Sequence, residues 1–477
     1  MNETFQTEFN EYRQARQTCW TENAAQPNHS LGGYYSHALQ NIYGHLVTTD
    51  ASILEIGCGA GALLASLKPA QGLGIDFCQS IIEQAKLAHP ALDFICVDAH
   101  ELDLHGRTFD FIVLSELVND LWDVQTVLSQ LKACCHPQTR IIFNFYSHLW
   151  NLPLRLARKF GLARQVLPQN WLTVHDMNNL LEISGFQMLS HSREILFPFQ
   201  TPLLTTVCNR YLAKIWPFRH LDMANLIVAR PIFAEKKREM SVSVVVAARN
   251  ESGHIDELMA RIPEMGAGTE IIFVEGNSTD DTYRAIERSI ANNPHKNCRL
   301  LKQPGKGKGD AVRAGFAAAT GDILMILDAD ITVPPEDLPR FYDLIASGDA
   351  EFINGVRLVY PMDTDAMRFA NLLGNKFFSW AFSWLLGQPI RDTLCGTKVL
   401  TSADYQRIAD NRAYFGDFDP FGDFDLLFGA ARLNLKILEV PIRYRARRYG
   451  ETNISRWKHG VLLLRMVVFA ARRIKFI

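Results

Sequence analysis

The sequence predicts an α/β protein of two domains joined head to tail, an N-terminal Rossmann-like domain and a C-terminal domain with a dicarboxylate strand end. Its 477 residues are too many for one ordinary domain and suit two α/β domains of about 200–250 residues each. Residues 53–61 run from an apolar strand into a glycine turn, the arrangement that binds nucleoside cofactors. Residues 323–330 form an apolar strand ending in Asp328 and Asp330, which suits a metal-bound sugar diphosphate.

The junction between the two predicted domains lies near residue 236. A closing strand is followed by the polar residues 235–240, and residues 241–248 begin a new buried strand. We therefore assign residues 1–235 to the first domain and residues 236–477 to the second.

The composition is typical of a globular protein with large cores, at 48% apolar and 21% charged residues. The nine cysteines are odd in number and include no CxxC pair, which favours free thiols in a cytosol. The polar and acidic residues after Met1 predict no signal or transit peptide. No stretch offers about 20 uninterrupted apolar residues, so we expect no transmembrane helix. A cytoplasmic protein is expected, peripheral on the inner face of the membrane.

Cations are concentrated at the C-terminal end. The whole sequence carries a formal charge of −2, whereas residues 432–477 contain twelve Lys or Arg and two Asp or Glu, a net charge of +10. We expect an anionic partner there, either a nucleotide diphosphate, a phospholipid surface or both, and no nucleic acid.

The C-terminal tail, residues 457–477, has apolar side chains at helical spacing among five cations. This pattern is typical of an amphipathic helix that lies at a membrane surface with its apolar stripe toward lipid. The alternative is a last helix packed on its own domain. The apolar residues are Leu462, Leu463, Met466, Val467, Ala470 and Ile474.

Four predicted strands of the first domain end in residues suited to a nucleoside. The first leads into three glycines, where a side chain would block a ligand from the strand end and the helix start. The second ends about twenty residues later in an aspartate that can bind ribose hydroxyls. The third ends in an aspartate and the fourth in a serine. These residues are Gly57, Gly59, Gly61, Asp76, Asp98 and Ser115.

With these residues the first domain resembles class I S-adenosylmethionine-dependent methyltransferases over residues 30–230. An NAD-binding Rossmann domain is disfavoured, because Asp98 ends a third strand as methyltransferases require. The resemblance implies that the glycine turn surrounds the methionine moiety, that Asp76 binds the ribose, and that Asp98 and Ala99 contact the adenine. The implied cofactor-binding residues are Glu55, Gly57, Gly59, Gly61, Asp76, Asp98, Ala99 and Ser115, with Glu116 and Leu117 beside Ser115.

The sequence does not name the methyl acceptor. Transfer to an oxygen that is easily deprotonated needs mainly alignment, so the base is one His or Tyr, or none. Tyr34, Tyr35 and His37 precede the first strand, and they either cap the pocket or serve in packing.

The second domain offers a metal site at a strand end. A basic glycine turn, residues 306–313, enters a helix shortly before the strand that carries Asp328 and Asp330. The two aspartates aim hard oxygen ligands at one point, which suits Mg²⁺ or Mn²⁺ bridging a diphosphate.

From about residue 241 to residue 454 this domain resembles family 2 glycosyltransferases of the GT-A fold, most closely the polyprenyl- and dolichol-phosphate sugar synthases. The resemblance implies a nucleotide-sugar donor, a lipid-phosphate acceptor and inversion at the anomeric carbon. It implies that Asp328 and Asp330 hold the metal, and that Arg357 reaches the phosphates or the acceptor. The implied donor-binding residues are Ala247, Glu251, Glu275, Asp328 and Arg357.

Two positions depart from that family. Glu275 and Gly276 stand where it commonly has two aspartates, and Asn453 stands where it often has a lysine. Arg447 and Arg448 could supply the missing cation.

Three acids are candidates for catalysis of sugar transfer. A hydroxyl acceptor needs a general base, and Asp423 stands at the position of the family's acidic motif. A lipid phosphate is already ionised and needs no base, in which case Asp423 or Asp425 would orient arginines. Asp392 is the third acid.

We therefore predict a bifunctional transferase, a methyltransferase joined to an inverting glycosyltransferase, acting in the synthesis of a glycolipid or surface polysaccharide. One alternative is a glycosyltransferase whose first domain is a binding module that no longer methylates. The retained glycines and Asp76 disfavour it. The other is a glycosyltransferase with a soluble acceptor, for which the basic, apolar tail would have no role.

Overall fold

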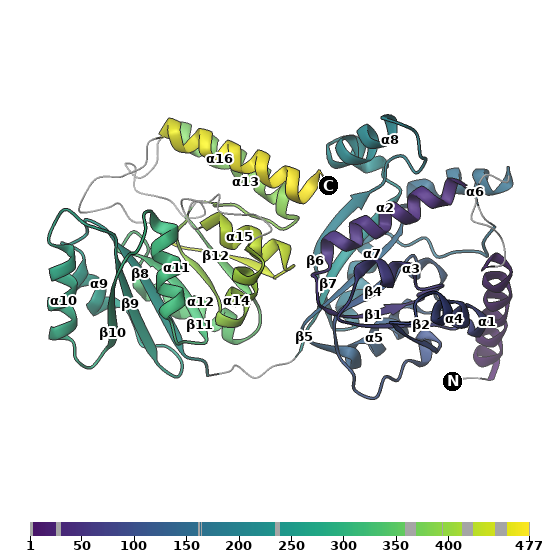
Figure 1. The fold of residues 1–477 in the computed structure, drawn as a ribbon, viewed down its shortest axis with the longest axis horizontal. Helices are drawn as coiled ribbons and strands as arrows, with labels where there is room; N and C mark the ends of the chain where they lie inside the picture. Colours follow the sequence, from purple (N-terminus) through teal and green to yellow (C-terminus); the bar gives the residue numbers. More distant parts are fainter. Residues whose placement is uncertain are drawn as a thin grey trace. The chain divides into compact units, whose positions relative to one another are not determined.

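The computed structural model describes residues 3–24, 30–160, 163, 165–233, 239–357, 369–393, 395–412, 423–443 and 456–476. The chain forms two compact units, residues 1–233 with 476–477, and residues 234–475. Each unit contains a seven-stranded mixed sheet flanked by helices (Figure 1).

The sheet of the first unit has the order β3-β2-β1-β4-β5-β7-β6. Strands β1 to β5 are parallel, and β7 runs antiparallel to both of its neighbours. The chain changes direction across the sheet between β1 and β4, and a crevice for a ligand is expected at the carboxyl ends of these strands. The strands are β1 (Ser52–Ile56), β2 (Gln71–Asp76), β3 (Asp93–Cys96), β4 (Phe109–Ser115), β5 (Cys135–Tyr146), β6 (Phe186–Glu194) and β7 (Ala224–Pro231).

Helices cover both faces of this sheet. Tyr43, Leu64 and Ile82 of α2 (Ser30–Leu46), α3 (Ala62–Leu67) and α4 (Gln79–Ala88) are buried in one core cluster. Leu128 and Leu181 of α5 (Val124–Leu131) and α7 (Val174–Ile183) are buried in another. The first unit also contains α1 (Glu3–Ala24), α6 (Asn151–Lys159) and the short α8 (Leu204–Thr206).

The sheet of the second unit has the order β10-β9-β8-β11-β13-β12-β14, with β13 antiparallel to both neighbours. Asp328 at the end of β11 lies in register with Ala247, and Glu275 at the end of β9 lies in register with Ala248. These ends therefore meet at one edge. The strands are β8 (Val242–Ala248), β9 (Thr269–Glu275), β10 (Asn297–Lys302), β11 (Ile323–Asp328), β12 (Phe352–Val356), β13 (Lys398–Thr401) and β14 (Ile437–Pro441).

The helices of the second unit also form two layers. Buried residues of α9 (Ile255–Arg261), α10 (Thr282–Asn292) and α12 (Leu338–Ala346) share one core cluster with Val244 and Val246 of β8. Helix α11 (Lys308–Ala318) packs on the opposite face, where Gly315 approaches Val245. Helices α14 (Ser402–Asp410) and α15 (Asp423–Arg432) pack against each other.

The C-terminal tail forms α16 (Arg456–Ala470), which packs beside α13 (Phe369–Leu386) (Figure 1). Leu463, Met466 and Ala470, which we expected to face lipid, are buried in this packing. This half of the stripe therefore faces its own domain, whereas Leu462, Val467 and Ile474 are half-buried. The spacing fixes a helix face but not what covers it. Within the described residues no helix combines the length and apolar character needed to cross a bilayer.

Candidate active sites

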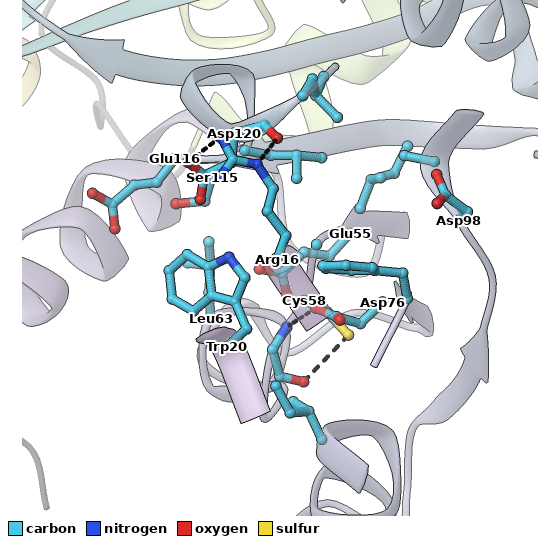
Figure 2. A pocket seen from close by; sticks show the side chains of 18 of the residues that line it. Arg16, Trp20, Glu55, Cys58, Leu63, Asp76, Asp98, Ser115, Glu116 and Asp120 are labelled. Carbon is cyan, nitrogen blue, oxygen red and sulfur yellow. Dashed lines mark hydrogen bonds and ion pairs between the residues drawn. The ribbon is translucent and has the colours of Figure 1, made fainter. Parts of the chain in front are cut away.

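A cavity of about 340 Å³ opens at the carboxyl ends of β1, β2 and β4 (Figure 2). Figure 2 shows Asp98 at one end of it and Glu116 at the other. Seven of the eight predicted cofactor residues line this cavity, namely Glu55, Gly57, Gly59, Asp76, Asp98, Ala99 and Ser115. The structure thus brings together residues that are up to sixty positions apart in the sequence.

The glycine turn shapes the cavity wall. Gly57 and Gly59 have φ values of +72° and +52°, a region that favours glycine. A Cβ on Gly57 would lie 2.9 Å from Leu117, whereas a Cβ on Gly59 would meet no atom within 4 Å. Gly59 therefore leaves room in the cavity. The eighth residue, Gly61, does not line it, and a Cβ there would lie 2.6 Å from the ring of Phe94.

Two buried acids fix the turn to the strands. Glu55 accepts a hydrogen bond from the backbone N–H of Leu64 at 2.9 Å, and burial raises its pKa to about 8. Asp76 accepts hydrogen bonds from the N–H groups of Gly59 at 3.1 Å and Cys78 at 3.0 Å, and burial raises its pKa. Each carboxylate oxygen has a second lone pair, so Asp76 can still accept a ribose hydroxyl.

Asp98 is held differently at its end of the cavity. It accepts hydrogen bonds from the backbone N–H and the ring of His100, at 2.9 and 2.8 Å, and lies 3.9 Å from the guanidinium of Arg13. Burial opposes its ionisation, but the hydrogen bonds of His100 and the charge of Arg13 outweigh burial and lower the pKa of Asp98.

Helix α1 forms a wall of the cavity that our sequence reasoning missed. Arg16 is buried, and its guanidinium donates to the carbonyl oxygens of Asp120 at 3.1 Å and Pro168 at 2.6 Å. The helical spacing of five α1 side chains could have revealed this face, but the methyltransferase resemblance began at residue 30. The five residues that line the cavity are Phe9, Tyr12, Arg13, Arg16 and Trp20.

Glu116 marks the end of the cavity away from Asp98. It follows β4 with a φ of +58°, and its carboxylate accepts a hydrogen bond from Tyr146 at 2.5 Å. Burial raises the pKa of Glu116 and outweighs the hydrogen bonds of Tyr146 and Tyr35. The ring of Tyr146 lies 6.2 Å from those of both Tyr35 and Trp171. A carboxylate and aromatic rings thus pack together beyond the cofactor residues.

The three side chains that we considered as caps do not line the cavity. The α2 residues that do are Ser36, Leu39 and Gln40. Tyr34 instead accepts a hydrogen bond from Asn209 at 2.9 Å, and His37 is exposed.

In the second unit, Asp328 is surrounded by cations. Its carboxylate lies 2.6 Å from the ammonium of Lys308. Burial opposes ionisation of Asp328, but Lys308, Lys398 and Arg357 outweigh it and lower the pKa. Asp330 accepts hydrogen bonds from the backbone N–H and the hydroxyl of Thr332, at 3.1 and 2.7 Å.

Sequence reasoning missed Lys308, Lys398 and Gly396 as parts of this site. Lys398 is buried and donates to the carbonyl oxygen of Cys395. A Cβ on Gly396 would lie 2.1 Å from Asp328 Oδ2 and 2.2 Å from Lys308 Nζ. Two signals were present in the sequence: Lys308 lies in the basic glycine turn, and Gly396 and Lys398 lie in the polar segment 392–398 that begins with Asp392.

The predicted nucleoside residues occupy adjacent strand ends. Glu275 accepts a hydrogen bond from the N–H of Ser278 at 2.5 Å. Glu251 is buried with His254, whose Nδ1 lies 2.9 Å from its carboxylate. Ala247 is in register with Asp328.

Both described acids from the catalytic set have arginine partners. Asp392 is 2% exposed and holds Arg357 through two side-chain contacts of 2.7 and 2.8 Å. Asp425 accepts a hydrogen bond from Arg412 at 2.8 Å. Asp423 is the first residue of α15, but its side chain lies outside the described set, as do Arg447 and Arg448.

The donor set at Asp328 and Asp330 suits a divalent cation through its two hard carboxylate oxygens. Among the described residues no cluster of three or more His, Cys, Asp or Glu side chains could hold a metal. A metal at this edge would therefore need further ligands from a bound diphosphate or water.

Comparisons with known proteins match the two units separately. The family model described as a methyltransferase domain matches residues 10–191, and the model described as glycosyl transferase family 2 matches residues 243–410. A dolichyl-phosphate hexose transferase from Haloferax volcanii is 29% identical over 228 residues, 48% of this chain and 92% of that protein. A dolichol-phosphate mannosyltransferase from Pyrococcus furiosus is 35% identical over 111 residues, 23% of this chain and 31% of that protein.

Solved structures resemble each unit. A glucosyl-3-phosphoglycerate synthase from Mycobacterium tuberculosis, solved with Mn²⁺ and UDP, is 21% identical with a TM-score of 0.37, covering 49% of this chain and 80% of that one. A possible histamine N-methyltransferase from Thermotoga maritima is 11% identical with a TM-score of 0.33, covering 42% and 90%.

Proposed function

We propose that this chain, which joins a methyltransferase domain to a family 2 glycosyltransferase domain, methylates one substrate with S-adenosylmethionine and glycosylates a lipid phosphate from a nucleotide sugar. The glycosylation is supported by the match to the dolichyl-phosphate hexose transferase, which spans 92% of that protein. The methylation is supported by the cavity of the first unit.

The residues of that cavity suit S-adenosylmethionine, which supplies an electrophilic methyl group when bound. Gly59 leaves space beside the turn, Asp76 has lone pairs for ribose hydroxyls, and Asp98 is ionised at the opposite end from Glu116. Glu116 with Tyr146 would take the proton from a hydroxyl acceptor as its oxygen gains the methyl group, or from an ammonium acceptor before its nitrogen does.

The second site depends mainly on charged side chains. Asp328 and Asp330 would hold Mg²⁺ or Mn²⁺, which neutralises the leaving diphosphate when bound. Lys308 and Arg357, the latter fixed by Asp392, add positive charge beside these acids. Ala247, Glu251 and Glu275 would hold the nucleoside; Arg447 and Arg448 would add cations. One displacement at the anomeric carbon inverts its configuration.

The pairing of two acids with arginines agrees with a lipid-phosphate acceptor. Such an acceptor is ionised at neutral pH and needs no general base, and Asp392 and Asp425 are both paired with arginines. A hydroxyl acceptor would instead require Asp423 as the base. Asp423→Asn separates the two cases: transfer to polyprenyl phosphate persists if the acceptor is a phosphate, whereas a strict loss of all transfer would contradict it.

Peripheral attachment to the cytoplasmic face of a membrane is part of the proposal. Its support in the second unit is the exposure of Phe377 and Trp380 on α13, and of Val461, Leu464 and Val468 on α16.

Reciprocal variants of the full chain test the two activities. Gly59→Arg places a large side chain in the cavity, so S-adenosylmethionine binding measured by calorimetry should vanish while sugar transfer continues. Asp328→Asn with Asp330→Asn should have the opposite effect. Absence of heat for the unmodified chain would favour a first domain without methylation, and sugar transfer that survives chelator would contradict the metal assignment.

A further inference from the structure

The first unit exposes a concentrated apolar surface. Of the twenty-one large hydrophobic side chains that are exposed among the described residues, four lie in residues 149–160 and nine in residues 199–221. We call these two segments the cap surface. Its exposed apolar residues are Leu149, Leu152, Leu156, Phe160, Phe199, Leu203, Leu204, Val207, Tyr211, Ile215, Trp216, Phe218 and Leu221.

The two segments adjoin in space. Trp150 donates a hydrogen bond from its indole to the carbonyl oxygen of Leu221 at 2.8 Å. Leu154 of α6 packs against the core, while Leu152 is 66% exposed. In the second segment Trp216 is 73% exposed. Both segments lie on the side of the sheet that α2 covers (Figure 1).

The charges of the cap surface have one sign. Its two segments contain six Lys or Arg and no Asp or Glu, in a chain whose acids and bases are nearly balanced overall. Arg155, Lys159, Arg210 and Arg219 are exposed. An exposed apolar patch with cations among its residues is the pattern of a face that inserts among anionic headgroups.

The cap surface is linked to the cavity by contacts. Arg158 on α6 donates to Gln169 at 2.8 Å, and Gln169 donates to the side chain of Asp120 at 3.3 Å. Asp120 lines the cavity, on the side of Glu116 (Figure 2). A molecule that reaches Glu116 from the cap surface therefore arrives at the end of the cavity away from Asp98.

We propose that the cap surface docks the methyltransferase domain on an anionic phospholipid bilayer, so that its methyl acceptor is a lipid-borne molecule. The docking itself does not depend on the proposed function, whereas the class of acceptor rests on it. This surface is separate in sequence from α13 and α16, and at its edge Arg210 donates to the carbonyl oxygen of Phe476 at 3.0 Å.

Vesicle flotation of the full chain tests the docking. The vesicles contain phosphatidylcholine alone or with phosphatidylglycerol. Leu152→Asp with Trp216→Asp should weaken binding to the anionic vesicles by about 10-fold or more, since both side chains leave water on insertion. The matched control is Leu87→Asp on α4, because Leu87 is 85% exposed and lies outside the cap surface. The control should bind as the unmodified chain does.

Hydrogen exchange of the full chain with and without these vesicles assigns the binding to a unit. Protection of residues 149–160 and 199–221 supports the proposal, even if α16 is protected as well. Protection confined to α13 and α16, or equal flotation of the control and the double variant, would overturn it. So would self-association in solution that the double variant abolishes without any vesicle binding. Calorimetry with S-adenosylmethionine separates failure of docking from failure of the proposed activity, because Leu87, Leu152 and Trp216 do not line the cavity.

Discussion

The two candidate sites use their acids in opposite ways. In the first unit Glu55 and Asp76 accept hydrogen bonds from backbone N–H groups, so the carboxylates hold a turn in shape. In the second unit Asp328, Asp392 and Asp425 are each paired with a lysine or arginine. One site is shaped before its ligand arrives, and the other is balanced in charge before its ligand arrives.

The pKa shifts follow the same division except at Asp98, where His100 and Arg13 lower the pKa. Burial raises the pKa of Glu55, Asp76 and Glu116, because few cations lie close enough to offset it. Asp328 is also buried, yet Lys308, Lys398 and Arg357 lower its pKa. The difference suggests that steric changes should damage the first site most and charge changes the second.

Gly396→Ala tests the limits of this comparison, because it makes a steric change in the site that depends on charge. The added Cβ would lie within 2.2 Å of Asp328 Oδ2 and Lys308 Nζ, so at least one of these groups must move. We expect sugar transfer to fall by about 100-fold or more, since small misplacements of reacting groups are this costly. Steady-state kinetics on the full chain measure it. The control is Gly374→Ala, where a Cβ meets no atom within 4 Å, and equal kinetics for both variants would contradict the close approach.

Asp392→Asn sharpens the comparison by removing charge without volume. Arg357 would lose its buried anionic partner while keeping a hydrogen-bond acceptor, so its guanidinium is held less firmly. We expect sugar transfer to fall by about 10- to 100-fold, the range for a charged hydrogen bond. The matched control is Asp337→Asn, which breaks the more exposed pair with Arg340. Activity that is unchanged in both variants would exclude a positioning role for Asp392.

Glu55→Gln has the smallest expected effect. It tests the first site, where the acids hold a turn in shape and are not paired with cations. The pKa of Glu55 in the folded protein, about 8, lies above its ordinary value of 4.5. The contribution of Glu55 to stability is therefore fully present below about pH 4.5 and is lost as the pH rises through about 8. Glutamine can still accept from Leu64 but does not titrate, so the free energy of unfolding should fall less over this interval.

Urea unfolding of the full chain at several pH values, followed by hydrogen exchange in peptides of β1 and α3, measures this effect. Glu83→Gln on the exposed face of α4 is the control. An identical pH dependence for Glu55→Gln and the unmodified chain would show that Glu55 does not titrate in this range.

The sequence predicted those parts of the two sites that lie in short, continuous motifs. Gly57, Gly59 and Asp76 line the cavity because strand ends determine where they lie. Arg16 and Gly396 were not predicted as site residues, because each matters only through neighbours that are distant in sequence. The apolar stripe of α16 shows the same limit: periodicity located a buried face but did not show that α13 covers it.

Helix α1 has a consequence for the timing of turnover. It contributes one wall of the cavity, and its buried Arg16 is bonded to Asp120 and Pro168. A nucleoside in the cavity is enclosed on that side, and it can be exchanged past α1 only after these hydrogen bonds have opened. A ligand that leaves on that side therefore does so no faster than α1 detaches, and Arg16 limits that rate through its two hydrogen bonds.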